Sequence, residues 1–506
     1  MKPFIVMGAS TLFLAACLTP DARPSPEPDA GTGGIGGQGG TSSAGGGGSG
    51  GSGGAATGDV VWGRAFGAPL YDQHASGVAV DPTDDSIYLV GSYKGEFSFD
   101  GTNNLSNKGY SDIYLAKFDS MGGFQWSIRS GDWADQYVNA VAVGGDRNIF
   151  LAGSYEGTLD LPNDVKLTDI GGQSDVFVVK LDPAGATVWA KGFGDGSQQP
   201  KIATTIAVDS QGNAVIAGYF SGSLEFIPSQ PISMMNNRDV FLAKLDKDGT
   251  PLWSKRLGNG DPGGPKDRIL CRIAIDHEDN IVLETAFTGT MSLGAPLPDV
   301  ATPGSRGILL AKFAPDGKPL WQQVFGAANA EQRSRALAVD SKNNIVLTGD
   351  MAGTVNFGGA SLSTSATGDP DLFVAKFAPD GKHIFSLRAG NAQPQEGRAI
   401  AVDAHDNVIV TGSYYGVLDF NTEGTLVSSG IGGGDYDLFA LKLDPNGKLV
   451  WAKAFGNGDD QYTEAMALDS KGHTIFGGSF DGNINLPKVV LTSTGYDDIF
   501  LMKLSP

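Results

Sequence analysis

The residues that most often carry catalysis are few in this chain and lie scattered along it. The sequence holds two cysteines, Cys17 and Cys271, and five histidines, His74, His277, His383, His405 and His473. No two histidines have the spacing of metal ligands, and the repeats described below contain no nucleophile elbow. Paired carboxylates from distant repeats would leave no local signature, so the sequence leaves open a hydrolase or lyase of the glycosidase kind.

One aromatic residue stands out as a candidate for binding. Trp133 lies in the polar loop Gly131-Asp132-Trp133-Ala134-Asp135-Gln136, outside the column of tryptophans that recurs in the repeats. An aromatic side chain in such a loop can stack on a sugar or anchor a protein partner. The alternative is a lid that packs on its own repeat.

Four polar residues occupy equivalent positions near the start of the predicted innermost strands. They are Asn139, Arg335, Arg398 and Glu464. If the repeats surround a central channel, these side chains ring its mouth and can clamp a carboxylate or another polar ligand. The alternative is a ring whose members pair with one another.

Two loops offer oxygen ligands of the kind that calcium prefers, namely 456–461 and 194–196. They lack the spacing of an EF-hand loop, and ordinary solvated turns are the alternative. The sequence therefore names calcium as the metal that would fit but assigns no metal site, and no other cofactor is evident.

The charge of the chain argues against a nucleic-acid partner. The formal net charge is −20 and the pI is about 4.6. An acidic surface repels a phosphate backbone. Only Cys271 remains if Cys17 carries a lipid, so we expect no disulfide within the folded part.

The elements that position these residues repeat about every 65 residues from Val60 onward. Each repeat reads as four short strands separated by Gly, Asp and Asn turns, which indicates a propeller blade. One column consists of alanines in the first strand: Ala79, Ala142, Ala207, Ala274, Ala338, Ala401 and Ala467. Another column consists of aromatics in the fourth strand: Trp62, Trp126, Trp189, Trp253, Trp321, Phe385 and Trp451. Because blades converge at the axis, the small residues suit the innermost strand and the large ones the outer strands.

The register of the repeats predicts how the ring closes. The first strand, Val60–Phe66, reads as a fourth strand, and the last, Ile499–Leu504, reads as a third strand. Pairing the two completes one blade and removes both free sheet edges. The fold class is therefore all-β: a seven-bladed β-propeller with four strands per blade over residues 59–506. Its long connections, second to third strand and fourth to first, should share one face, where we expect a partner to bind.

The repeats resemble the bacterial seven-bladed β-propeller repeat family, abbreviated SBBP. The resemblance rests on the Asp-x-Phe-x-Ala-Lys strand, the Asp-Gly turn and the Ala-φ-Asp strand, and it covers about residues 59–506. Blade 4 departs most, with Arg306-Gly307 before its third strand and Thr285 in place of a glycine after its second. The resemblance implies a fold and is nearly silent on function.

The N-terminus resembles that of bacterial lipoproteins. A short apolar stretch ends in Leu14-Ala15-Ala16-Cys17, which is similar to a lipobox. The resemblance implies a signal peptide over 1–16, lipid (diacylglycerol and an acyl chain such as palmitate) on Cys17, and a location in the outer membrane or at the cell surface. Residues 17–58 then form a Gly, Ser and Pro-rich linker that tethers the propeller.

Together these features favour a binding or scaffolding protein over an enzyme. The predicted partner is an unknown protein or glycan on the long-loop face, with membrane attachment through the lipid. The alternative function is a propeller-type hydrolase or lyase that acts on extracellular polysaccharide through loop carboxylates.

Overall fold

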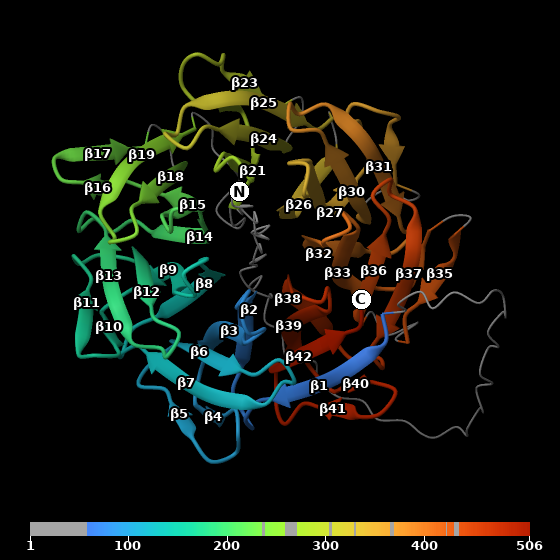
Figure 1. Cartoon of the computed structure of the whole chain (residues 1–506), viewed down its shortest axis with the longest axis horizontal. Coiled ribbons are helices and arrows are strands. Elements are labelled where there is room, and N and C mark those ends of the chain that lie inside the picture. The colour runs from blue at the N-terminus through green and yellow to red at the C-terminus, as the bar shows by residue number, and fades with distance from the viewer. Residues whose placement is uncertain are drawn as a thin grey trace, which may run out of the picture.

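Seven four-stranded antiparallel sheets surround a central axis as the blades of a propeller (Figure 1). The computed structural model describes residues 58–234, 238–258, 271–302, 306–327, 330–364, 369–420, 423–429 and 435–506. Over these residues the protein is a seven-bladed β-propeller with four strands per blade, as the repeat predicts. The predicted signal peptide and lipid-bearing Cys17 lie outside them. Within the described ranges, no helix has the length and apolar character needed to cross a membrane.

From the axis outward, each blade has its first, second, third and fourth strand in chain order, except that the fourth strand of blade 7 is the N-terminal strand of the chain. Blade 1 contains β2 (Gln73–Val80), β3 (Ile87–Tyr93), β6 (Asp112–Phe118) and β7 (Phe124–Ser130). Blade 2 contains β8 (Gln136–Val143), β9 (Ile149–Tyr155), β12 (Asp175–Leu181) and β13 (Thr187–Phe193). Blade 3 contains β14 (Lys201–Val208), β15 (Ala214–Phe220), β18 (Asp239–Leu245) and β19 (Pro251–Leu257).

The remaining blades follow the same order. Blade 4 contains β20 (Cys271–Ile275), β21 (Ile281–Phe287), β24 (Gly307–Phe313) and β25 (Pro319–Phe325). Blade 5 contains β26 (Glu331–Val339), β27 (Ile345–Ala352), β30 (Asp371–Phe377) and β31 (His383–Ala389). Blade 6 contains β32 (Gln395–Val402), β33 (Val408–Tyr414), β36 (Asp437–Leu443) and β37 (Leu449–Phe455). Blade 7 contains β38 (Gln461–Leu468), β39 (Thr474–Phe480), β42 (Asp498–Leu504) and β1 (Val60–Phe66).

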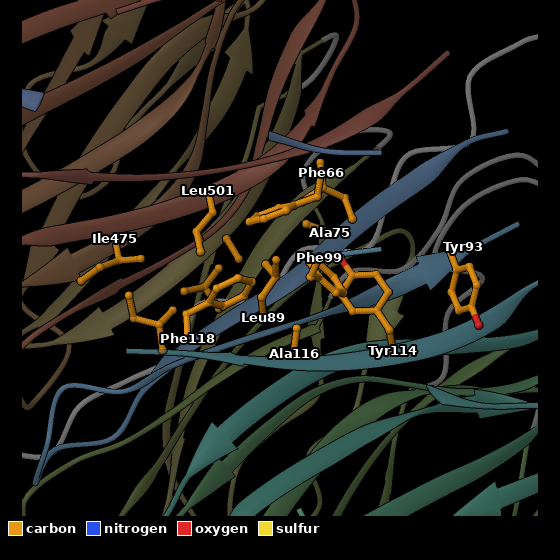
Figure 2. Packing of buried hydrophobic residues seen from close by; sticks show 14 of the residues in the cluster. Phe66, Ala75, Leu89, Tyr93, Phe99, Tyr114, Ala116, Phe118, Ile475 and Leu501 are labelled. Atoms are coloured by element: carbon orange, nitrogen blue, oxygen red, sulfur yellow. The ribbon is translucent and has the colours of Figure 1, made fainter. Parts of the chain in front are cut away.

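Blade 7 confirms the predicted closure. The N-terminal strand β1 pairs antiparallel with β42, with Trp62 opposite Lys503 and Phe66 opposite Ile499. Figure 2 shows the seam that results, where Ile475 and Leu501 of blade 7 approach the side chains of blade 1. The seam is packed with buried apolar residues, as between the other blades.

The connection from second to third strand is more than a loop, which refines the prediction. In every blade it contains a two-stranded hairpin that lies at the rim (Figure 1). The hairpins are β4 (Glu96–Ser98) with β5 (Asn104–Ser106), β10 (Thr158–Leu161) with β11 (Val165–Thr168), β16 (Ser223–Ile227) with β17 (Gln230–Ser233), β22 (Thr290–Met291) with β23 (Val300–Ala301), β28 (Thr354–Val355) with β29 (Leu362–Ser363), β34 (Val417–Asp419) with β35 (Thr425–Val427), and β40 (Asn483–Asn485) with β41 (Val490–Thr492).

The core confirms the role predicted for the alanine column. Each column alanine shares an apolar cluster with a larger residue of the next innermost strand, as Ala79 does with Val141 and Ala467 does with Val78. The small side chain lets neighbouring blades approach closely near the axis. Dense packing of this kind is sensitive to changes of a single methylene.

The short-turn face is held by two repeated contacts. Five third-strand lysines form buried ion pairs with the acid that follows the first strand of the same blade, as Lys244 does with Asp209 at 2.8 Å. The fourth-strand aromatics lie on a glycine in the next blade's turn, and Trp189 also donates its indole N–H to Lys247 O at 2.9 Å. The ion pairs tie strands together within a blade and the aromatic contacts cross to the next blade, so we assign this face to the scaffold.

Candidate functional site

The predicted ring residues sit at a feature that the sequence did not reveal. Six innermost strands carry a β-bulge, an extra residue with no partner on the second strand. The extra residues are Ser76, Asn139, Thr204, Arg335, Arg398 and Glu464. The equivalence that the repeats predict for four of them is therefore a shared backbone geometry.

A glycine on the second strand makes room for each bulge. A Cβ at Gly91 would lie 1.8 Å from His74 O, and one at Gly412 would lie 1.9 Å from Glu396 O. The same crowding occurs at Gly153, Gly218, Gly349 and Gly478. His74 belongs to β2, because the strand starts one residue before it.

The six bulge residues form a ring around the axis, and its uncharged members, Ser76, Asn139 and Thr204, form hydrogen bonds from one blade to the next. The Ser76 hydroxyl donates to Val138 O. The Asn139 amide donates to Ala203 O at 2.8 Å, and the Thr204 hydroxyl donates to Cys271 O at 3.1 Å. Each bulge side chain in blades 1 to 3 thus satisfies a backbone carbonyl on the following blade, and these links hold the innermost strands together.

The other half of the ring is charged. Arg335 pairs with Asp350 and, at 3.2 Å, with Glu396. Arg398 pairs with Glu396 at 2.8 Å and with Glu464 at 3.2 Å, so the chain of ion pairs crosses blades 5, 6 and 7. Both arginines, Asp350 and Glu464 are buried. Removing one partner of a buried pair leaves an uncompensated charge, so these contacts matter for folding whatever else they do.

Blade 4 extends this network with a different geometry. Arg272 donates to Arg335 O at 2.8 Å and lies near Glu284, which is fully buried. Burial raises the pKa of Glu284 well above its ordinary value, and the charge of Arg272 offsets only part of that effect. The structure thus joins Arg335, Arg398 and Glu464 in one network and places Asn139 in the neutral half. A ligand clamp at these four residues stays a prediction.

Trp133 lies on the long-loop face with its side chain in solvent. The connection from β7 to β8 carries it, and the side chain is 77% exposed, so it does not pack as a lid. Its backbone rests against the preceding long connection, since a Cβ at Gly109 would lie 2.4 Å from Trp133 Cα.

The loop that carries Trp133 is held by hydrogen bonds. The Asp132 carboxylate accepts from Ala134 N at 3.0 Å and from Thr158 N at 2.8 Å. Gln136 donates to Asp132 at 3.0 Å and to Glu156 O at 2.8 Å. The buried Gln136 thus fixes the loop from below, and equivalent glutamines begin β2, β32 and β38.

Three more aromatic side chains are exposed on long connections where blades 7 and 1 meet, and the sequence analysis missed them. They are Tyr71, 48% exposed, Tyr110, 71% exposed, and Tyr496, 61% exposed. We call these three and Trp133 the aromatic arc. Tyr110 and Tyr496 each stand two residues before a third strand, in blades 1 and 7, which closure makes neighbours. Their shared repeat position was a signal, but their exposure depends on the folded loops.

The loops that carry the aromatic arc lie next to one another on this face, in the order Tyr496, Tyr71, Tyr110 and Trp133. A Cβ at Gly495 would lie 3.2 Å from Pro69 Cα, next to the loop of Tyr71. The Tyr71 ring rests on Gly95, whose φ is 74°, a conformation that glycine adopts without strain. Tyr71 and Tyr110 then line one open hollow of about 540 Å³, together with Lys94, Glu96, Ser106 and Asn107.

In the two loops considered for calcium, Asp195 and Asp460 use carboxylate oxygens for internal contacts. Asp195 pairs with the buried Lys201 at 2.6 Å and caps Ser197 N and Ser223 N at 2.9 Å each. Asp460 accepts from Tyr436 N at 3.1 Å. In the described part of the chain, no group of three or more His, Cys, Asp or Glu residues is placed to hold a metal ion.

Comparison with curated sequences gives distant relatives. No protein-family model matches the chain. The uncharacterized WD repeat-containing protein L264 of Acanthamoeba polyphaga mimivirus is 23% identical over 478 residues, which cover 78% of this chain and 34% of that protein. The regulatory protein FlaEY of Caulobacter vibrioides is 26% identical over 221 residues, which cover 42% of this chain and 21% of that protein. The chain thus spans about a third of the first relative and about a fifth of the second.

Comparison with solved structures gives matches of low sequence identity and low TM-score. Sqt1 from Chaetomium thermophilum is 11% identical, with 89% of this chain and 100% of that chain covered and a TM-score of 0.39. The WD40 β-propeller domain of Doa1 is 8% identical, with 70% of this chain and 93% of that chain covered and a TM-score of 0.28. Scores this low carry no argument about function. The class of the protein, a seven-bladed β-propeller, follows from its own strand pairing.

Proposed function

We propose that this protein is a binding propeller of the bacterial cell envelope that presents its long-loop face to a partner and has no catalytic role. The observation that carries the proposal is the aromatic arc, which leaves four large rings in solvent on loops fixed by the scaffold. Exposed aromatic anchors on rigid loops favour binding, because little conformational entropy is lost when a partner docks. The charged ring is engaged in its own ion pairs and supports the scaffold.

We further propose that lipid on Cys17 anchors the chain in the outer membrane or at the cell surface, as an SBBP-type lipoprotein. The support is the lipobox-like Leu14-Ala15-Ala16-Cys17. Wild-type protein should enter the detergent phase of a Triton X-114 partition, and Cys17→Ser should stay in the aqueous phase. Equal partition of the two proteins would contradict the anchor and would leave the binding face untouched.

The binding function is tested with the full chain carrying Cys17→Ser, so that lipid does not add its own affinity for membranes. Fluorescently labelled protein is incubated with envelopes isolated from the source cells, and the bound fraction is measured by sedimentation. We expect saturable binding that Trp133→Ala combined with Tyr110→Ala reduces at least tenfold. Met121→Ala, in an exposed turn on the opposite face, is the control and should bind as the parent does. If only Met121→Ala lost binding, the site would lie on the short-turn face, and the proposed long-loop site would be contradicted.

A further inference from the structure

The chemistry of the aromatic arc indicates what kind of partner it takes. We infer that the ligand is a neutral polysaccharide chain whose sugar rings stack on the arc, an inference that rests on the proposed binding function. The aromatic side chains of the arc stand on separate loops and are separated by polar groups. This alternation suits a pyranose, which has an apolar C–H face and a rim of hydroxyl groups.

Stacking is the first contribution. The faces of Tyr and Trp rings carry partial negative charge, and the C–H bonds on a sugar face carry partial positive charge. Trp133 and Tyr110 are the most exposed members of the arc, at 77% and 71%. Their loops run side by side, because Ser111 bridges to Asp135 in parallel and Gln136 N donates to Ser111 O at 2.9 Å. The two loops that carry the rings are therefore fixed to each other.

Hydrogen bonding to hydroxyl groups is the second contribution. The hollow between Tyr71 and Tyr110 is lined by Lys94, Glu96 and Asn107, which supply both donors and acceptors. Its volume of about 540 Å³ lies within the roughly 300–1,000 Å³ that is typical of small-ligand sites. A sugar unit seated there would have polar partners at its edge and a tyrosine on either side.

The surface is less suited to a protein partner. Protein interfaces are built around a contiguous, desolvated core with a closely packed surround, and their hot spots lie in well-packed pockets. Here the hollow is open and polar side chains separate the rings. A protein that docked on the arc would leave Lys94 and Glu96 in need of matched charges, whereas hydroxyl groups satisfy either one.

The net charge of the chain and the length of the aromatic arc further restrict which saccharides can bind. The chain has a formal net charge of −20, so an anionic polysaccharide would be repelled. The arc runs across connections of blades 7, 1 and 2, which exceeds what a single sugar can contact. We therefore expect an oligosaccharide to bind more tightly than its monosaccharide.

The test is affinity electrophoresis of the full-length Cys17→Ser chain in native gels that contain a soluble polysaccharide. The neutral probes are a β-glucan, a xylan and a mannan, and polygalacturonate is the anionic probe. We expect retardation by at least one neutral polymer and none by polygalacturonate. Trp133→Ala should weaken the retardation about tenfold or more, whereas Trp133→Phe should retain most of it because the ring remains. Met121→Ala should migrate as the parent does.

Oxidation by N-bromosuccinimide gives a second readout that does not depend on gels. Trp133 is the most exposed tryptophan, so it should react first, and a bound neutral oligosaccharide should slow that first step. Retardation by polygalacturonate alone, or an unchanged response of Trp133→Ala, would overturn the polysaccharide proposal.

Two further outcomes separate this inference from the proposed function. Suppose that envelope binding depends on the arc but is destroyed by protease and survives removal of glycans. The partner is then a protein, and the polysaccharide inference fails while the binding function stands. New reducing ends in the polysaccharide would show catalysis and would overturn the proposed function itself.

Discussion

Thr285 faces Cys271 across the two innermost strands of blade 4, with the Cys271 sulfur 3.5 Å from the Thr285 hydroxyl. At this level six other blades place a glycine opposite a bulge, and the described part of blade 4 has no bulge. In the bulged blades, a Cβ at the second-strand glycine would clash with a carbonyl oxygen of the first strand beside the bulge. A threonine therefore does not fit there, and we attribute the two differences to one cause. The exchange of glycine for threonine and the loss of the bulge are thus one coupled change.

This coupling predicts the effect of a threonine in another blade. Gly412→Thr would place its Cβ 1.9 Å from Glu396 O, so the bulge that presents Arg398 has to move. We expect the variant to lose about 3 kcal/mol or more of the free energy of unfolding. The converse change, Thr285→Gly, removes the hydroxyl contact with Cys271 and raises the conformational entropy of the unfolded chain. We expect it to lose about 1 kcal/mol of the free energy of unfolding. Urea denaturation measures both, and equal losses would contradict the coupling.

The repeat was enough to predict blades and closure, and not enough to predict the bulge. The alanine column needs only side-chain size and period, so Ala79 and its equivalents gave the innermost strand correctly. The amino-acid composition of the first strand does not show that Arg398 is an extra, bulged residue. The sequence feature that accompanies the bulge is Gly412 on the second strand. Which acid pairs with Arg335 depends on contacts between blades, and the exposure of Tyr110 depends on how the loops rest on one another.

The closing strand predicts a difference between two tryptophans. Trp62 lies in β1, is 7% exposed and rests on Gly122 of blade 1, whereas Trp133 is 77% exposed. Trp62→Ala removes a buried ring at the seam between blades 7 and 1, and we expect a loss of about 3–5 kcal/mol. Trp133→Ala should change stability by less than about 0.5 kcal/mol. Thermal melting compares the two, and a large loss in Trp133→Ala would show that this ring belongs to the scaffold.

Two buried carboxyls in blade 7 predict opposite pH dependences. Burial raises the pKa of Asp469, but hydrogen bonds from Lys503 and the backbone N–H of His473 outweigh it and hold the pKa below its ordinary value. Its stabilising effect is therefore full above the ordinary carboxyl pKa of about 4 and is lost as pH falls through the lower folded value. Burial also raises the pKa of Asp498, and Thr494 offsets only part of this, so stability is lost as pH rises through the raised value.

Asparagine variants test these two signs. At pH 7, Asp469→Asn leaves Lys503 without its charge partner and should lose about 3 kcal/mol, a difference that shrinks in acid. Asp498→Asn should cost less than about 1 kcal/mol at pH 7, because Asp498 Oδ1 has no hydrogen-bond partner within the described residues. Melting temperatures from pH 3 to pH 8 give both profiles. A larger loss at pH 7 in Asp498→Asn than in Asp469→Asn would contradict the assignment.

The charged ring predicts a strong coupling between Arg398 and Glu464. The two are buried 3.2 Å apart, and Arg398 also lies over the Tyr462 ring, with its guanidinium carbon 5.1 Å from the ring centroid. Arg398→Ala removes the cation that faces buried Glu464 and should lose about 3–5 kcal/mol, whereas Glu464→Ala leaves Arg398 paired with Glu396 and should lose less. In the double variant no charge of this pair is stranded, and the loss should fall well short of the sum. Additive losses would mean that the pair contributes nothing to the ring.

The same double variant decides whether the ring takes part in recognition. The aromatic arc lies on exposed connections of blades 7, 1 and 2, whereas Arg398 and Glu464 are buried in the innermost strands of blades 6 and 7, so envelope binding measured below the melting temperature should stay within about twofold of the parent. Trp133→Ala provides the comparison, since it should leave melting unchanged and reduce binding. If the double variant instead melts near the parent and loses binding tenfold, Arg398 and Glu464 contact the ligand as the sequence predicted, and the binding site extends from the arc into the channel mouth.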